Sequence, residues 1–75
     1  MGGRLTIGRR IIFYRERAGL NRMELARRAG ITRRTLILLE DDENDSPRLG
    51  TLRAIAGALG VPVKELIPDI MPAVA

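Results

Sequence analysis

The chain has 75 residues, enough for one small domain, and it contains no cysteine and no histidine. Disulfide bonds, cysteine or histidine catalysis and the usual zinc sites are therefore excluded. Apolar residues make up 45% of the chain, as in a globular protein, and their runs are too short to span a bilayer. Thirteen Lys and Arg residues against nine Asp and Glu residues give a formal net charge of +4, and a basic domain favours nucleic acid or an acidic surface as partner.

These charges are unevenly distributed along the chain. Twelve of the thirteen basic residues are arginine, whose planar guanidinium can bind phosphate or guanine through two parallel hydrogen bonds. Residues 40–45 hold five of the nine acidic residues, so the rest of the chain has thirteen basic residues against four acidic ones. The sequence therefore describes a basic domain with one acidic loop.

The first helix is predicted over residues 5–18. Ile7, Ile11 and Tyr14 are spaced by four and three residues, so they lie on one face of a helix and can point into a core. Gly19 follows and ends the helix.

The second helix is predicted over residues 22–29. Asn21 precedes it and Glu24 follows three residues later, which is the spacing of a capping box. Gly30 then suits the left-handed backbone position that commonly follows a helix C-terminus.

Three further helices complete the predicted chain. Thr32 caps the third, which places Leu36 and Leu39 inward and ends near Asp41. After a polar loop, a fourth helix is predicted over 49–59, and a short fifth one over 62–67 between two prolines. The inward residues of the fourth helix are Leu52, Ile55, Ala56 and Leu59. We therefore predict an all-α domain of five short helices over residues 1–67, followed by an apolar, proline-containing tail over 68–75.

The connection between the second and third helices indicates a helix-turn-helix. Residues 29–32 leave too little chain for a long antiparallel hairpin, so the two helices meet at a steep angle. Such a corner needs a small residue where the helices cross, a glycine in the turn and apolar residues filling the wedge. Ala26 and Gly30 meet the first two needs, and the wedge residues are Leu25, Ile31, Leu36 and Leu39.

On these residues the sequence resembles the lambdoid phage repressor and Cro family of helix-turn-helix proteins. The resemblance covers about residues 5–67. It is carried by five segments: GLNRMELA at 19–26, AGIT at 29–32, LE at 39–40, PRL at 47–49 and AGALGV at 56–61. The resemblance implies a lambda-repressor-like domain and an internal ion pair between Arg15 and Glu40.

The resemblance also implies how the chain binds DNA. The third helix is the recognition helix in the major groove, and Arg33 and Arg34 are its first exposed residues, within reach of guanine edges. The residues expected near phosphate are Asn21, Arg22, Thr32 and Arg48. The alternative interpretation of each arginine is a solvated charge on a helix face.

Two features depart from the family pattern on the expected DNA-binding side. Ile37 and Leu38 occupy recognition-helix positions that polar side chains usually fill. They are interpreted either as contacts to thymine methyl groups or as a face for a protein partner. The acidic loop over 41–45 would repel phosphate. It lacks the glycine and the final glutamate of an EF-hand loop, so no metal site is predicted there.

A third departure concerns the first helix. Ile12 and Phe13 extend its apolar face beyond Ile11 and Tyr14, so at least one of them should be exposed. That exposure indicates either a surface patch for another protein or a contact with the C-terminal tail.

The sequence thus predicts a cytoplasmic, sequence-specific transcriptional regulator. It would act as a repressor by occupying a palindromic operator as a homodimer, without cofactor, metal or membrane. The expected dimer surface, which could instead cover the domain's own core, consists of Val63, Ile67, Ile70, Met71 and Val74. The alternative function is a protein-interaction module with weak or lost DNA binding. An enzyme is not predicted, because beyond carboxylates and hydroxyls only Tyr14 and Lys64 offer reactive groups.

Overall fold

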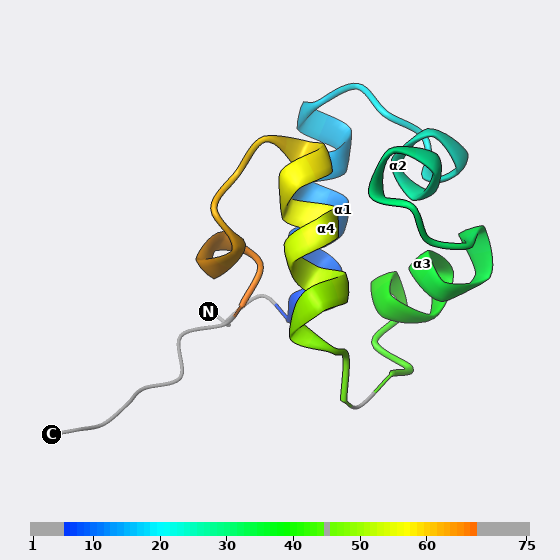
Figure 1. The fold of residues 1–75 in the computed structure, drawn as a ribbon, viewed down its shortest axis with the longest axis vertical. Coiled ribbons are helices and arrows are strands. Elements are labelled where there is room, and N and C mark those ends of the chain that lie inside the picture. Colours follow the sequence, from blue (N-terminus) through cyan, green and yellow to red (C-terminus); the bar gives the residue numbers. More distant parts are fainter. Residues whose placement is uncertain (1–5, 45, 68–75) are drawn as a thin grey trace, which may run out of the picture.

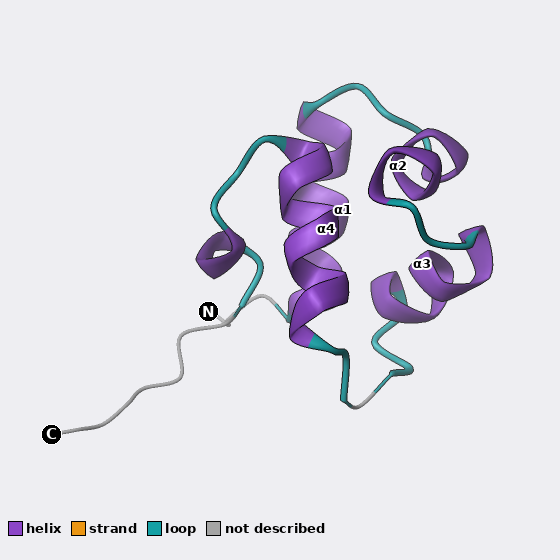
Figure 2. Cartoon of the chain, viewed as in Figure 1, coloured by secondary structure: helices purple, strands orange, loops and turns teal. Residues whose placement is uncertain are grey.

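The computed structural model describes residues 6–44 and 46–67 as a bundle of helices without a strand in those ranges. Helices α1 (Ile7–Arg17) and α4 (Leu49–Leu59) overlap near the centre of Figure 1, while α2 (Arg22–Ala29) and α3 (Arg33–Glu40) lie to one side. Figure 2 shows short loops between them. The bounds of α2 and α4 agree with the predicted ones, and α1 begins two residues later than predicted because Thr6 is its N-cap.

The predicted fifth helix is wrong in type and length. Residues Val63–Glu65 form a single 3-10 turn, η1, in which Glu65 N donates to the Pro62 carbonyl and Leu66 N donates to the Val63 carbonyl. Pro62 and Pro68 enclose only five residues, and the backbone before a proline is restricted as well. Too few residues remain for α-helical hydrogen bonds, and the tighter turn forms instead.

The core takes side chains from all four α-helices and from the residue after η1. The largest fully buried side chains are Ile11, Leu25, Leu36, Ile55 and Leu66. They come from α1, α2, α3, α4 and the residue after η1, so burial of these side chains connects the whole domain.

The turn between α2 and α3 has the geometry that the sequence predicts. Asn21 and Glu24 form a complete capping box at the start of α2, and Gly30 ends the helix with a left-handed φ of 72°. Ala26 is 3% exposed, and Leu25 is fully buried. The small residue and the glycine therefore allow α3 to pack across α2 as in a helix-turn-helix.

The start of α1 lies against the end of α3 at very close range. A Cβ atom added to Gly8 would stand 2.4 Å from the Leu39 carbonyl oxygen and 2.5 Å from that of Glu40. Only glycine allows this approach without a backbone shift. The contact also brings the N-terminus of one helix to the C-terminus of another, where their dipoles attract.

Asp42 completes this contact from the acidic loop. Its carboxylate accepts hydrogen bonds from Thr6 Oγ1 at 2.6 Å and from Gly8 N at 3.0 Å. An acid at a helix N-terminus is stabilising because it meets unpaired N–H groups and the positive end of the dipole. Asp42 is also the one non-glycine residue of the described ranges with a left-handed φ, 58°.

Candidate nucleic-acid interface

The N-terminal end of α3 presents arginines to solvent. Thr32 caps this end by accepting a hydrogen bond from Thr35 N at 3.0 Å. Arg33 and Arg34 follow directly, and both are exposed. In the described residues neither forms a salt bridge. The cap therefore fixes the backbone of the first turn, while the two guanidinium groups remain available to a ligand.

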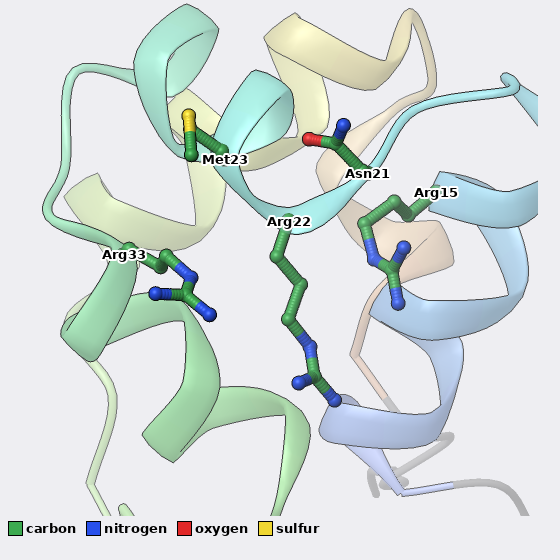
Figure 3. A pocket seen from close by; sticks show the side chains of 5 residues that line it. All are labelled: Arg15, Asn21, Arg22, Met23 and Arg33. Carbon is green, nitrogen blue, oxygen red and sulfur yellow. The ribbon is translucent and has the colours of Figure 1, made fainter.

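A shallow basic pocket adjoins this end of α3. It encloses about 400 Å³ and is lined by Arg15, Asn21, Arg22, Met23 and Arg33. Figure 3 shows these side chains, with Arg22 between Arg15 and Arg33 in that view. The first turn of α2 contributes unpaired backbone N–H groups and the positive end of its dipole. Three arginines beside a helix N-terminus favour an anionic ligand such as phosphate.

A buried carboxylate fixes two of these arginines. Glu40 is 3% exposed. Arg15 Nε lies 2.7 Å from its Oε2 atom, and Arg22 Nε lies 2.8 Å from its Oε1 atom. Arg15 also donates to the Leu20 carbonyl at 3.0 Å, which ties the α1–α2 loop to the same network. The ion pair implied between Arg15 and Glu40 is thus present, with a second arginine that the sequence analysis assigned to phosphate only.

Arg22 combines a structural contact with exposure. Its hydrogen bond to Glu40 is the main cause that raises the pKa of the guanidinium above its usual value. Its side chain is nevertheless 40% exposed, so part of the guanidinium borders the basic pocket. Contact of Arg22 with phosphate stays a prediction. Such a contact would use a side chain that Glu40 already orients.

The apolar pair on α3 is less exposed than predicted. Ile37 and Leu38 are both half-buried rather than exposed. Ile37 borders the stripe formed by buried Leu36 and Leu39, since successive helical residues are about 100° apart. After the end of α3 the chain turns back at Asp42, and Glu43 N donates to the Leu38 carbonyl at 2.9 Å. The loop thus returns to the last turn of α3.

The other predicted phosphate contacts are the N-cap residues of α2, α3 and α4. Asn21 is exposed, and its amide oxygen and its backbone N–H are both used by the capping box with Glu24. Arg48 is exposed at the N-cap of α4, where its side chain makes no capping hydrogen bond. Asn21 and Arg22 border the same pocket as Arg33, whereas Arg48 and Thr32 do not line it.

Two features of the structure had no signal in the sequence. Met23 lines the basic pocket and is 54% exposed, although its spacing in α2 gives no sign of a role. Asp42 was expected only to repel phosphate, but its carboxylate caps α1. No local pattern could reveal this, because its partners precede it by 34 and 36 residues.

Comparison with known proteins places this geometry in a family. The helix-turn-helix domain family matches residues 6–67. The chain belongs to that family. It is a family of DNA-binding regulators rather than of enzymes, and the all-α, lambda-repressor-like fold agrees with the predicted class. No helix in the described ranges is long and apolar enough to cross a membrane.

Three relatives illustrate the match. The immunity repressor protein of Bacillus phage phi105 is 38% identical over 65 residues, which are 87% of this chain and 44% of that protein. A crystal structure of SinR, a Bacillus subtilis protein, in complex with DNA has a TM-score of 0.78 and 33% identity, over 81% of this chain and 97% of that one. The DNA-binding domain of the P22 C2 repressor is similar in fold, with a TM-score of 0.77 and 20% identity, over 87% of this chain and 84% of that one. The chain spans less than half of the phi105 repressor's length.

Proposed function

We propose that the chain is a sequence-specific transcriptional repressor that inserts α3 into the major groove of a palindromic operator. The observation that carries this proposal is the pair of exposed arginines, Arg33 and Arg34, at the capped start of α3. An arginine at this position can donate two hydrogen bonds to guanine, which are worth about 1–3 kcal/mol of base discrimination. Similarity to SinR, whose structure includes DNA, and to a phage immunity repressor supports the proposal.

The basic pocket would hold the phosphate backbone beside the recognition helix. Arg22 and Arg33 border it from α2 and α3, and contacts of this kind fix the register of a protein on DNA without reading sequence. Thr32 and Arg48 would add phosphate contacts on either side. Since the protein would act on DNA, we place it in the cytoplasm.

Homodimer formation is part of this proposal because one module of this size offers few contacts. Interfaces of single DNA-binding modules bury only about 600–1,000 Å² of protein surface. A two-fold dimer on two half-sites doubles the contacts and explains a palindromic site. Of the predicted dimer residues, Val63 and Ile67 are half-buried, and Val63 packs against the core. Ile70, Met71 and Val74 lie outside the described residues.

The alternative function, a protein-interaction module, loses its main support. It depended on Ile37 and Leu38 being exposed on the recognition helix, and both are half-buried. In the acidic loop the Asp42 carboxylate is held at the start of α1, where it accepts from Thr6 and Gly8, and the loop keeps its negative charge.

The test is selection of binding sites from random duplex DNA over a series of salt concentrations. The wild-type protein should enrich a two-fold site, and its affinity should fall steeply with salt. Arg33→Ala with Arg34→Ala should abolish the site preference while the circular dichroism spectrum stays unchanged. The matched control is Arg27→Ala with Arg28→Ala, which removes two adjacent exposed arginines from α2 and should retain the enriched site. Enrichment of one and the same site by both double variants would contradict the assignment of α3.

A further inference from the structure

The outer face of α1 carries a short stripe with an unusual order of charges. Arg9, Ile12, Phe13 and Glu16 line a hollow of about 230 Å³ on the surface. Their spacing places them on one side of the helix, about 150° round the axis from buried Ile11. The stripe therefore faces away from the core. Along the helix it consists of one basic residue, two apolar residues and one acidic residue.

The apolar centre of this stripe is incompletely covered by the domain itself. Phe13 is 44% exposed, one of the large apolar side chains of the described residues that solvent reaches most. Its ring meets the Tyr14 ring edge-on at 5.0 Å, and the Arg17 guanidinium lies 5.2 Å from its centroid. An exposed aromatic ring beside a half-buried isoleucine is the kind of centre around which protein contacts form.

The charged ends of the stripe have no salt-bridge partner among the described residues. Arg9 and Glu16 are both exposed, and in residues 6–44 and 46–67 neither forms a salt bridge. Each stands about three and a half residues, or roughly 5 Å along the axis, from the midpoint between Ile12 and Phe13. The two charges are thus opposite in sign and symmetric about the apolar centre.

We infer that this stripe binds the same stripe of a second copy of the chain, with the two α1 helices antiparallel. A two-fold axis through the midpoint sets Arg9 of each copy opposite Glu16 of the other and brings both Phe13 rings to the centre. Such a contact is self-complementary, as a two-fold interface must be. A parallel arrangement would instead place like charges together. The contact leaves the exposed arginines of α3 free, because α3 packs against the inner side of α1.

This inference goes beyond the proposed function and does not depend on DNA binding. It uses residues of α1 rather than those within 63–74 for which the sequence predicts dimer contacts. Four residues form a smaller contact than a standard protein interface. We therefore expect a dissociation constant between about 10 μM and 1 mM for association through α1.

The experiment is sedimentation velocity over that concentration range, without DNA. The variants are Arg9→Glu, Glu16→Arg and the double exchange of both. Each single reversal places like charges opposite one another and should weaken association about tenfold or more. The double exchange recreates two opposite-charge pairs and should restore the wild-type concentration dependence. Arg53→Glu, a reversal on the exposed side of α4, is the control and should associate like the wild type.

The outcomes separate this contact from any other. Association through residues 63–74 would be insensitive to all these reversals, so equal sedimentation of wild type and variants overturns the inference. A wild-type protein that remains monomeric at about 1 mM overturns it too. A double exchange that fails to restore the association weakened by the single reversals also overturns the inference. Thermal unfolding of each variant checks that the fold is intact, which is expected because Arg9 and Glu16 are exposed.

Discussion

The two ends of α3 use charge in opposite ways. At its C-terminal end, Glu40 is 3% exposed and is paired with Arg15 and Arg22. At its N-terminal end, Arg33 and Arg34 are exposed and form no salt bridge in the described residues. Both ends belong to one helix of eight residues, in which the fold pairs one charge and leaves two others available. Burial and pairing, rather than residue type, therefore distinguish structural arginines from arginines available to a ligand.

Glu40→Ala should be the most damaging single change at the buried end. It leaves the Arg15 guanidinium, whose side chain is 12% exposed, as an unpaired charge beside the core. Removing one partner of a buried pair costs about 3–5 kcal/mol. Because a domain of this size has little stability to lose, the variant should be largely unfolded without a stabilising cosolvent. Urea unfolding of both proteins in the same stabilising cosolvent, followed by circular dichroism, measures the loss.

Arg34→Ala is the matched change at the exposed end. It also removes a charge from α3, but in the described residues that side chain forms no salt bridge, so its loss leaves no charge unpaired. The free energy of unfolding should therefore change by no more than about 0.5 kcal/mol. Equal losses for Glu40→Ala and Arg34→Ala would show that the two ends of the helix do not differ in this way.

Gly8→Ala probes the same buried end through shape instead of charge. The added methyl group would meet the carbonyl oxygens of Leu39 and Glu40 at 2.4 and 2.5 Å, so α1 and α3 must separate. We expect a loss of about 1–3 kcal/mol in the free energy of unfolding, as for other overpacked sites. Chemical denaturation of wild type and variant measures it.

Gly57→Ala supplies the control for that change. Gly57 lies inside α4, and a Cβ atom there would meet nothing within 4 Å. Alanine favours helix over glycine by about 0.8–1.0 kcal/mol, so this variant should be more stable than the wild type. Two glycine-to-alanine changes in helices should therefore shift stability in opposite directions, and a loss at both positions would contradict the close-contact argument.

The sequence predicts best the features that neighbouring residues decide. The capping box of Asn21 with Glu24 and the left-handed turn at Gly30 depend on residues within one or two helical turns. The Arg15–Glu40 pair joins residues 25 apart, and it could be anticipated only because the sequence resembles a known family.

Features that depend on distant contacts could not be predicted in this way. The crowding at Gly8 arises where α1 meets α3, and the capping role of Asp42 depends on partners more than thirty residues away. Ile37 and Leu38 are half-buried in the folded domain. Local periodicity treats them as exposed, and nothing in the sequence around them indicates otherwise. The roles of Arg33 and Arg34 in base contact remain predictions.

The partly buried hydrogen bond between Tyr14 and Glu65 is intermediate between the buried and the exposed end of α3. Its loss should have the smallest effect on stability and a distinctive pH dependence. Tyr14 is half-buried, and its hydroxyl donates to Glu65 Oε1 at 2.9 Å, joining α1 to η1. This hydrogen bond is the main cause that raises the Tyr14 pKa above its ordinary value of 10.0, with desolvation and the Glu65 charge adding to it. The folded state therefore holds the phenolic proton more tightly than the unfolded chain does.

The sign of the pH effect follows from that difference. The stabilisation is fully present below the unfolded pKa near 10, and it is lost as the pH rises through the higher folded pKa. Urea midpoints measured from about pH 8 to pH 11 should fall for the wild type and fall less for Tyr14→Phe. The two proteins differ only at residue 14, so the difference between the two curves isolates the tyrosine. The chain has one tyrosine and no tryptophan, so ultraviolet absorbance of the phenolate reports its pKa directly in the folded protein. A folded-state pKa at or below 10 would show that Glu65 does not hold the hydroxyl, and the bridge between α1 and η1 would then rest on the hydrogen bond from Arg10 Nη1 to the Glu65 carbonyl and on apolar contacts.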